Sequence, residues 1–495
     1  MVKHCLMIFT GLLIGLTSGF GLSQDMVHMT VDSLILAQKL DDAEKVARDA
    51  IKKYPDHPQV MCALACVYRN RAIRSAIRVN TDAMGIKDGE NGTYTIQDSS
   101  DFEQLFQDEN YYDEAQYAKA ESLYYRIIAK HPSYHNAYFN LLNDYVTMKR
   151  FVPYFKVIDL FIGNLHDDPD TPHYVLDLAM KLYNAEYWDE ALRLYERLLQ
   201  AYPDFSQAKC NIGAVYVNLG KIDKAHEVFA DVYKIAPLDL LNLNNYFLTS
   251  ILTEDFPLAY ELIVDLIRKD DQDYSHFYDA ALLAYLIGKN YHAFLNIYLP
   301  QRKEHVEQPD DDFWYWTAKQ LAHVDTMTQE ETLEFFDYLM IQFNQADMKR
   351  QALIAAAIID QSESTNASLL VRCGIYDQFK YVDKTLSYLG KIKARAAIDS
   401  TIMTPRDLTY NYGRIYYVAQ NADSAIAYFS KYSTERSDNA FVNYALGESY
   451  LMKADTSSAI VCFKTNQALE DESQMQYINA SIRELKNLGE AAERE

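Results

Sequence analysis

The sequence has few residues that break helices. Its 495 residues include 16 glycines and 12 prolines, and so small a share of both types argues against an all-β chain with many tight turns. Tryptophan is scarce, with three copies, whereas tyrosine is abundant, with 40. The composition therefore favours long helices rich in aromatic side chains, some for packing and some for a binding surface.

Sequence motifs of common catalytic and cofactor sites are missing. The chain has no glycine-rich phosphate loop, no HExxH pair, no GxSxG turn and no CxxC. The histidines are dispersed. His131 and His135 are four residues apart, but Pro132 lies between them and no third ligand is nearby in the sequence. We therefore expect no enzyme, no bound metal and no cofactor.

The charge balance is strongly acidic. The chain has 47 basic and 70 acidic residues, a net charge of −23. A field of that sign repels nucleic acid and anionic lipid, so neither is expected as a partner. The cysteines are scattered and do not resemble a disulfide framework. Cys62 and Cys66, one helical turn apart, are expected as small core residues, with a bridge or a metal pair as the alternatives.

The N-terminus reads MVKHCLMIFTGLLIGLTSGFGLSQ. A basic start at Lys3, an apolar run from Cys5 to Leu16 and the small residue Ser23 are typical of a secretory signal, with cleavage expected before Gln24. The apolar run is short for a membrane span, although its retention as an uncleaved anchor stays open. We therefore expect an exported protein of the periplasm or cell exterior, without an integral membrane segment after signal cleavage.

One stretch of the sequence recurs. Residues 211–229 read NIGAVYVNLGKIDKAHEVF, in which a glycine, an aromatic residue, an alanine and a second aromatic residue follow one another at set intervals. The alanine position repeats every 34 residues, and near the C-terminus the whole set occurs twice at the same spacing. The recurring residues are Ala191, Ala225, Ala259 and Ala293, then Gly413, Tyr416, Ala425 and Phe429, and then Gly447, Tyr450, Ala459 and Phe463.

This spacing resembles the tetratricopeptide repeat family, whose unit is a helix-turn-helix hairpin of that period. Helices can cross closely only where side chains are small, so we expect Gly213 and Ala225 at the crossing, with Tyr216 and Phe229 beside it. Pro237 would end the second helix. The resemblance implies an all-α fold of tetratricopeptide-like hairpins stacked in a right-handed superhelix, in which each hairpin covers the apolar face of the one before.

The repeat pattern also divides the chain into segments. Regular units alternate with a polar, acidic insertion and with a stretch in which the 34-residue spacing is lost but helical patterns persist. The expected segments are a signal peptide (1–23), an N-terminal array (24–300) with the insertion at about 81–114, divergent hairpins (301–405), a C-terminal pair of regular units (406–473), and a capping helix with a tail (474–495).

In the family that the chain resembles, the first helices of the hairpins line a concave groove that takes an extended peptide or another protein's helix. Carried over by repeat position, this implies a surface rich in tyrosine and asparagine, which supply contact area and hydrogen bonds to a bound backbone. Contact with neighbouring helices alone is the other interpretation. The candidate groove residues are Tyr183, Asn184, Asn218, Asn244, Tyr410, Arg414, Tyr417 and Tyr444.

A short basic stretch, YRNRAIRSAIR, interrupts the acidic chain. Arg71, Arg74 and Arg78 would form a stripe on one face of a helix. Such a stripe could pair with the acidic insertion that follows, or it could hold an anionic ligand.

Together these patterns predict a non-catalytic, exported scaffold that binds a protein or peptide in its groove, in the assembly of the cell envelope or in secretion. Tyr410, Arg414 and Tyr444 are the expected anchors, because tyrosine and arginine often dominate interface energetics. The alternative is a glycan- or nutrient-binding helical-repeat protein of the outer membrane.

Overall fold

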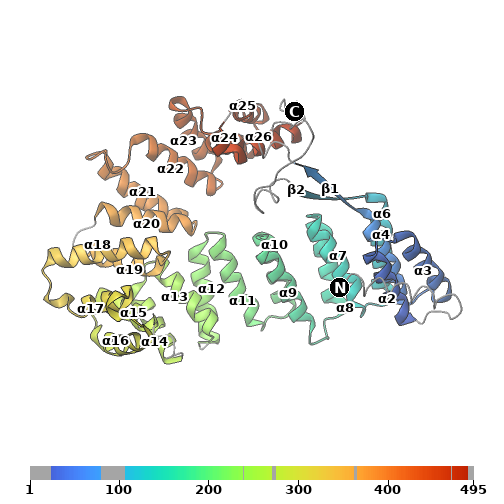
Figure 1. The fold of residues 1–495 in the computed structure, drawn as a ribbon, viewed down its shortest axis with the longest axis horizontal. Coiled ribbons are helices and arrows are strands. Elements are labelled where there is room, and N and C mark those ends of the chain that lie inside the picture. The colour runs from blue at the N-terminus through green and yellow to red at the C-terminus, as the bar shows by residue number, and fades with distance from the viewer. Residues whose placement is uncertain are drawn as a thin grey trace. The chain divides into compact units, whose positions relative to one another are not determined.

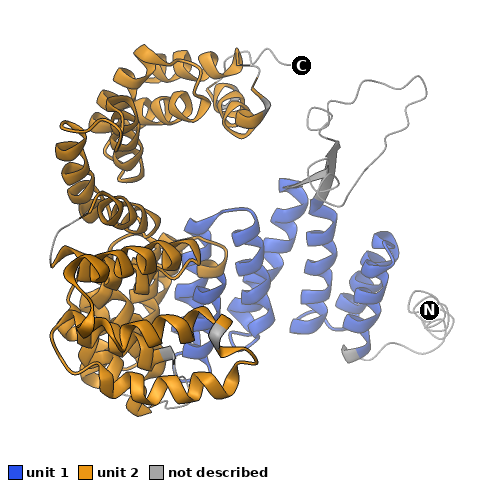
Figure 2. Cartoon of the chain, turned by 60° about the vertical axis from the view of Figure 1, so that its left-hand side comes forward, with its two compact units in different colours: residues 1–181, 200–202 blue, residues 182–199, 203–495 orange. Residues whose placement is uncertain are grey.

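The computed structural model describes residues 24–79, 106–237, 239–269, 275–361, 365–469 and 471–488. These residues are largely helical, and most successive helices pack against each other in pairs (Figure 1). The chain forms two compact units, residues 1–181 with 200–202 and residues 182–199 with 203–495 (Figure 2).

The helices of unit 1 are α2 (Gln24–Leu36), α3 (Leu40–Lys53), α4 (Pro58–Ala72), α6 (Glu114–Lys130), α7 (His135–Thr147) and α8 (Phe151–Asn164). The unit boundary runs through α9 (Thr171–Asn184) and α10 (Trp188–Ala201). Unit 2 continues with α11 (Ser206–Asn218), α12 (Ile222–Ile235), α13 (Leu240–Leu252), α14 (Phe256–Lys269), α15 (Ser275–Leu286), α16 (His292–His305), α17 (Phe313–Leu321), α18 (Gln329–Gln345), α19 (Lys349–Asp360), α20 (Asn366–Gln378), α21 (Val382–Ala396), α22 (Pro405–Val418), α23 (Ala422–Glu435), α24 (Ala440–Met452), α25 (Thr456–Gln467) and α26 (Met475–Asn487). Short 3₁₀ turns are η2 (Pro309–Asp311), η3 (Val324–Thr326) and η4 (Glu472–Gln474).

The hairpins share one kind of turn. In the α11–α12 turn Gly220 has a φ of +69°, its N–H donates to Val217 O at 3.0 Å, and the N–H of Lys221 donates to Tyr216 O at 2.8 Å. These bonds satisfy carbonyl groups at the end of the first helix. The same left-handed conformation recurs at the tips of the other hairpins, although most of the residues there are not glycine. They are Gln38, Lys149, Glu186, Gly220, Glu254, Gly288, Asp347, Lys380, Gln420 and Ala454.

The helix crossings explain the repeated small residues, except Ala293, which is exposed near the start of α16. Ala225 has no exposed surface. The Phe229 ring lies directly over Gly213, and the Phe429 ring lies so close to Gly413 that a Cβ there would be 2.6 Å from it. A larger side chain at these glycines would displace the ring. The expected crossing is therefore confirmed, and with it the all-α fold of helical hairpins.

A two-stranded antiparallel ribbon interrupts the hairpin of α4 and α6. Strand β1 (Ile73–Val79) pairs with β2 (Phe106–Tyr112), with Ile73 opposite Tyr112. The N–H of Asp113 donates to Ala72 O at 2.8 Å, and the Asp113 carboxylate caps the first turn of α6. The insertion thus leaves and re-enters the hairpin at its tip, and α4 still packs on α6. Sequence patterns identified a polar insertion but not the ribbon.

The prediction that three arginines form a stripe on one face of a helix is therefore wrong. Helix α4 ends at Ala72, so Arg71 lies in its last turn while Arg74 and Arg78 belong to strand β1, opposite Tyr111 and Gln107. The physical reason is the sequence IRSAIRV, in which three of the seven residues are β-branched and favour an extended backbone. Three arginines spaced by three and four residues cannot form one stripe across a helix end.

Between residues 301 and 405 the structure again has hairpins. Helix α18 packs on α19 and α20 packs on α21, each pair with a left-handed residue at its tip. Helix α17 is short and lies between two 3₁₀ turns. The regular spacing fails here because of this extra helix and the longer connections, while the hairpin unit itself persists.

The residues of the expected signal, 1–23, lie outside the described part of the chain. Within the described part, no helix combines the length and the apolar character needed to cross a membrane. The described cysteines are unbridged; Cys62 is buried and Cys66 is half-buried.

Candidate functional site

The predicted groove residues lie on first helices, but their surroundings differ. Asn184 is exposed at the end of α9. Asn218 donates from Nδ2 to the Tyr183 hydroxyl at 2.6 Å and to Ala214 O at 3.2 Å. The amide of Asn218 and the hydroxyl of Tyr183 are thus used for contact between neighbouring helices, the alternative interpretation of these positions.

The face of α13 is covered by the chain itself. Asn244 is half-buried and lines a pocket of about 460 Å³. One wall of the pocket comes from α13, and the other comes from the α18–α19 turn, the start of α19 and Phe379. The remaining lining residues are Asn245, Leu248, Asp347, Met348, Lys349, Arg350 and Gln351.

Polar contacts fix α19 in this place. Gln351 Nε2 donates to Asp279 Oδ1 at 2.7 Å, and both side chains are buried. The Arg350 guanidinium lies 5.2 Å from the centroid of the Phe247 ring and 3.7 Å from Asp279 Oδ2. Helix α19 packs against both α13 and α15. An extended peptide cannot occupy that face while α19 lies on it.

A second set of contacts, which we name the Glu254 clasp, joins the α13–α14 turn to the α20–α21 hairpin. Glu254 Oε1 accepts from Arg372 Nη1 at 2.8 Å, from the Tyr376 hydroxyl at 2.7 Å and from the Tyr388 hydroxyl at 2.6 Å. Lys384 Nζ donates to Glu254 Oε2 at 2.6 Å. Arg372 is 4% exposed, so these bonds compensate a buried charge.

Burial would raise the pKa of Glu254, but hydrogen bonds from Lys384, Tyr388 and Tyr376 and the charge of Arg372 outweigh it and hold this pKa at about 2. The clasp carboxylate is therefore ionised throughout the physiological range. Its ionised form is the one that all of these donors stabilise.

The tip of α20–α21 also contacts the neighbouring hairpin turns. The Tyr381 hydroxyl donates to Asp223 Oδ1 at 2.6 Å. Lys380 Nζ lies 4.4 Å from the centroid of the Trp188 ring. The Lys380 backbone packs so closely on Gly220 that a Cβ at Gly220 would collide with the Lys380 carbonyl oxygen. The turn of α11–α12 therefore has glycine for two reasons, its positive φ and this contact.

The first helices near the C-terminus present a different surface, the C-terminal aromatic face. Phe441 of α24 is central: its ring centroid is 6.1 Å from that of Tyr410, 6.2 Å from that of Tyr417 and 5.2 Å from that of Tyr477. Tyr444 lies 6.3 Å from Tyr477. All five rings are half-buried. They form a continuous aromatic surface across α22, α24 and α26.

Three of these rings were predicted by repeat position and two were not. Tyr410, Tyr417 and Tyr444 are brought together as expected. Phe441 was missed because it does not stand at one of the repeat positions carried over to the groove, and Tyr477 was missed because α26 was expected to act only as a cap. An aromatic residue near the start of both α24 and α26 was the available signal.

Arg414 does not project freely from this face. Its guanidinium makes two hydrogen bonds with the Asp377 carboxylate of α20, at 3.0 Å and 2.8 Å. Such a paired geometry holds the side chain in place and neutralises its charge locally. The expectation that Arg414 anchors a partner together with the tyrosines is weakened by this internal pairing.

Glu448, one turn beyond Tyr444 on α24, is the carboxylate of the C-terminal aromatic face. It is half-buried. Burial raises the pKa of Glu448, and the Glu484 carboxylate of α26 raises it further. Burial raises the pKa of Tyr417 to about 12, with Tyr444 and Glu448 adding to the effect. No ion pair joins Glu448 to another described side chain.

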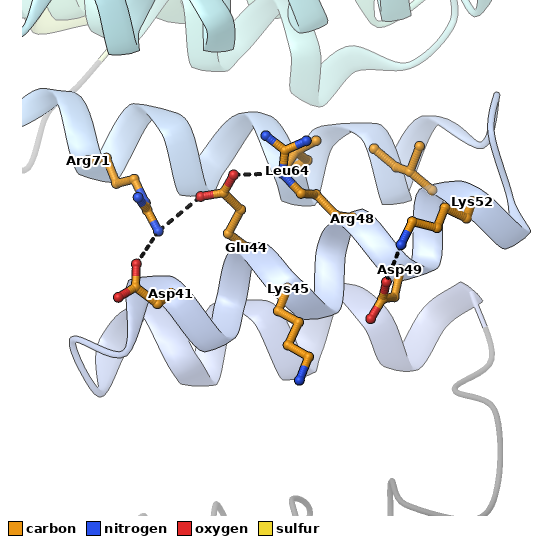
Figure 3. Close-up of a pocket in the computed structure, with 9 residues that line it drawn as sticks. Asp41, Glu44, Lys45, Arg48, Asp49, Lys52, Leu64 and Arg71 are labelled. Carbon is orange, nitrogen blue, oxygen red and sulfur yellow. Dashed lines mark hydrogen bonds and ion pairs between the residues drawn. The ribbon is translucent and has the colours of Figure 1, made fainter.

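Unit 1 has a pocket of about 740 Å³ beside α3 and α4 (Figure 3). Arg71 Nη2 lies 2.9 Å from Glu44 Oε2 and also pairs with Asp41. Arg48 pairs with Glu44 at 2.7 Å, and in Figure 3 these side chains point toward one another. Arg71 is thus paired with two carboxylates of α3. The pocket's other lining residues are Lys45, Asp49, Ile51, Lys52 and Leu64.

Among the described residues, no three His, Cys, Asp or Glu side chains gather in a way that could hold a metal ion. His131 Nε2 hydrogen-bonds to Asp56 O at 2.6 Å, whereas His135 packs edge-on against Phe139 and Tyr174. The two histidines therefore have separate surroundings.

One segment of the chain matches a known protein family. Residues 176–239 match the family described as "Tetratricopeptide repeat". No curated protein matches the chain. Among solved structures, the complex of Naa15/Naa10 bound to HypK-THB has a chain that is 11% identical at a TM-score of 0.32, with 94% of this chain and 68% of that chain covered.

Two further solved structures are similar at the same low level. A tetratricopeptide repeat protein from Parabacteroides merdae is 12% identical at a TM-score of 0.23, with 63% of this chain and 98% of that one covered. The TPR domain of P58(IPK) is 13% identical at a TM-score of 0.19, with 76% and 95% covered. The matched segment 176–239 includes α11 and α12, whose left-handed turn recurs in other hairpins and whose glycine–phenylalanine crossing recurs in α22–α23 and α24–α25. The chain therefore contains a segment, residues 176–239, that matches the tetratricopeptide repeat family.

Proposed function

We propose that this protein is a non-catalytic interaction scaffold that binds an extended segment of a protein partner on its C-terminal aromatic face. The observation that carries the proposal is the set of five half-buried rings on α22, α24 and α26. Rigid aromatic side chains give large contact areas with little loss of conformational entropy, and they are frequent at interface hot spots.

The location of the other predicted residues supports the choice of this face. Asn244 lies beside α19, and Asn218 is bonded to Tyr183. The C-terminal aromatic face has no such covering helix among the elements that pack on α24, which are α22, α23, α25 and α26. A partner could therefore reach it without displacing a described part of the chain.

The test is a selection from a random peptide library on the immobilised full chain, repeated with Tyr410→Ala and Tyr444→Ala. Truncation of an anchoring ring should weaken binding by about 2 kcal/mol, roughly 30-fold. Thermal melts of both variants show whether the helices persist, because Tyr410 and Tyr444 also pack on Tyr432 and Phe463. Peptides bound equally by folded variants and by the wild type would reject this face as the binding site.

We further propose that the scaffold works outside the cytoplasm, in the assembly of the envelope or in secretion. The support is the N-terminal sequence alone, with its basic start, apolar run and small residues. Mass spectrometry of the mature N-terminus tests this. A protein that begins at Gln24 in the extracytoplasmic fraction is the expected result, and one that begins at Met1 would contradict signal cleavage.

Glycans are the competing ligands, because aromatic rings can also stack on sugars. The same wild-type and variant proteins should therefore be assayed on a glycan array. Sugar binding that is lost with Tyr410→Ala or Tyr444→Ala would favour the glycan-binding alternative over a protein partner.

A further inference from the structure

The C-terminal aromatic face has an electrostatic character that sets it apart from a plain apolar surface. Glu448 stands on α24, next to Tyr444 and near Tyr417, and is half-buried. Its pKa is raised by burial and by the Glu484 carboxylate. A carboxylate in this position has lost part of its hydration without gaining a described ion-pair partner, which costs free energy.

The other charges of the neighbourhood do not remove this cost. Arg414 on α22 is held by Asp377 at 2.8 Å. On α26, Glu484 adds negative charge beside Glu448, while Arg483 acts on Tyr444, where it opposes the rise in the pKa of that tyrosine. Among the described side chains, Glu484 on α26 is thus a second carboxylate that acts on Glu448.

The rings beside Glu448 favour the same sign of ligand. The faces of tyrosine rings attract cations, and the attraction grows when water is excluded. Tyr444 lies one helical turn before Glu448 on α24, and the charge of Glu448 helps to raise the pKa of both Tyr417 and Tyr444. A lysine or arginine side chain of a partner could place its stem on the rings and its charged end at Glu448, which would satisfy both the rings and the carboxylate.

We propose that the partner segment presents a lysine or arginine side chain to Glu448, between Tyr417 and Tyr444. This inference rests on the proposed function, because it specifies what the C-terminal aromatic face recognises. The occupant is a basic segment of another protein. The carboxylate and the rings act together, since each attracts a cation and the rings also provide contact area for its aliphatic stem.

The probe is a set of immobilised seven-residue peptide mixtures, random except for a central residue fixed as lysine, arginine or norleucine. Norleucine keeps the aliphatic stem of lysine and lacks its charge. The full wild-type chain should bind the lysine and arginine mixtures about 10-fold more tightly than the norleucine mixture, as expected for a charge-assisted hydrogen bond.

Glu448→Gln should reduce this preference to about 3-fold or less, since an amide accepts a hydrogen bond but has no charge. The matched control is Glu435→Gln, an exposed glutamate at the end of α23, which should keep the full preference. Because the pKa of Glu448 is raised, its charge destabilises the fold at neutral pH, so Glu448→Gln should not lower the melting temperature.

A pH series gives a second readout. The wild-type preference for lysine over norleucine should decline as the pH falls through the raised pKa of Glu448, and Glu448→Gln should show little change over the same range. The other carboxylates of this neighbourhood are Glu484 on α26, which acts on Glu448, and Asp377 on α20, which is paired with Arg414, so Glu484→Gln is measured beside it.

The outcomes separate this inference from the proposed function. Binding that depends on Tyr410 and Tyr444 but shows no preference for a cation, or a preference that survives Glu448→Gln, overturns the inference and leaves the proposed function standing. Binding that depends on neither ring overturns both. Cation preference lost with Glu448→Gln and kept with Glu435→Gln supports both.

Discussion

Two groups of hairpins in unit 2 have the same architecture and different surfaces. In α11–α14 and in α22–α25, the two helices of each hairpin join through a left-handed residue, and a phenylalanine ring packs over a glycine in α11–α12, α22–α23 and α24–α25. Yet α13 is covered by α19 and joined to α20–α21 by the Glu254 clasp, whereas α22 and α24 carry the C-terminal aromatic face. The repeat thus determines the hairpin, whereas contacts between residues more than 100 positions apart in the sequence determine which first helices a partner can reach.

The largest effect on this comparison should come from Glu254→Ala. It leaves the buried Arg372 with Asp360, at 3.3 Å, as its remaining carboxylate, and it removes the acceptor for two tyrosine hydroxyls and Lys384. Loss of one side of a buried pair costs about 3 kcal/mol or more. Urea unfolding followed by circular dichroism should show the destabilisation, and hydrogen exchange should place it in α20 and α21.

Glu186→Ala is the matched control, because Glu186 occupies the same left-handed turn position of the α9–α10 hairpin and is exposed. It should change the free energy of unfolding by less than about 0.5 kcal/mol. Equal effects of the two substitutions would mean that the clasp does not hold the hairpin.

Acid should release the clasp within a defined pH window. The pKa of Glu254 is lowered from 4.5 to about 2, so the carboxylate stabilises the fold above the unfolded-state value, and that stabilisation declines as the pH falls from about 4.5 to about 2. The difference in stability between wild type and Glu254→Gln should be constant from pH 7 to pH 5 and shrink below that. A difference that grows on acidification would contradict this assignment.

Gly220 and Gly288 offer a sharper test of how the α20–α21 tip packs on the α11–α12 turn. Both have positive φ, but a Cβ at Gly220 would collide with Lys380, and one at Gly288 would meet nothing within 4 Å. Alanine at Gly288 should cost about 1 kcal/mol for the left-handed backbone alone. Alanine at Gly220 should cost that amount plus about 1–3 kcal/mol for the collision.

Thermal or urea unfolding of both alanine variants measures the difference. The Gly220 variant should also loosen the contact of Tyr381 with Asp223. If the two glycines prove equally tolerant, the packing of the α20–α21 tip on the α11–α12 turn is not tight in solution.

The smallest effect is expected at the left-handed turn of the α22–α23 hairpin. Gln420 has a φ of +55° and is exposed. Gln420→Gly should stabilise the protein by at most about 1 kcal/mol, since glycine adopts this conformation without steric cost while losing more chain entropy on folding. Differential scanning calorimetry can resolve the small rise in melting temperature. A fall would show that the Gln420 side chain makes a contact of its own.

The sequence predicts the hairpins well because their packing is local. Gly213, Ala225 and Phe229 lie within one unit, and the constraint that pairs them repeats at a set spacing. The left-handed turns were harder to foresee, because most of them carry residues such as Glu186 or Gln420 in place of glycine. Backbone hydrogen bonds at the helix end impose that conformation irrespective of the side chain.

The candidate site was only partly predictable, because several of its contacts join distant parts of the sequence. Repeat position brings Tyr410, Tyr417 and Tyr444 onto one surface, but it carries no information about a distant segment that covers a face. Neither the place of Asn244 beside α19 nor the pairing of Arg414 with Asp377 follows from a 34-residue period. Such contacts depend on how the divergent hairpins fold back, which local patterns do not encode.

The ribbon of β1 and β2 has a consequence for protein engineering. Its two ends meet at the tip of the α4–α6 hairpin, where Asp113 donates to Ala72 O and α4 still packs on α6. Since the chain departs from the hairpin and returns to it at adjacent points, a segment inserted there need not disturb the packing of α4 on α6. Exchange of residues 73–112 for a reporter domain with adjacent termini should therefore yield a folded fusion. The other hairpin tips should accept an inserted domain in the same way where no neighbouring turn packs on them.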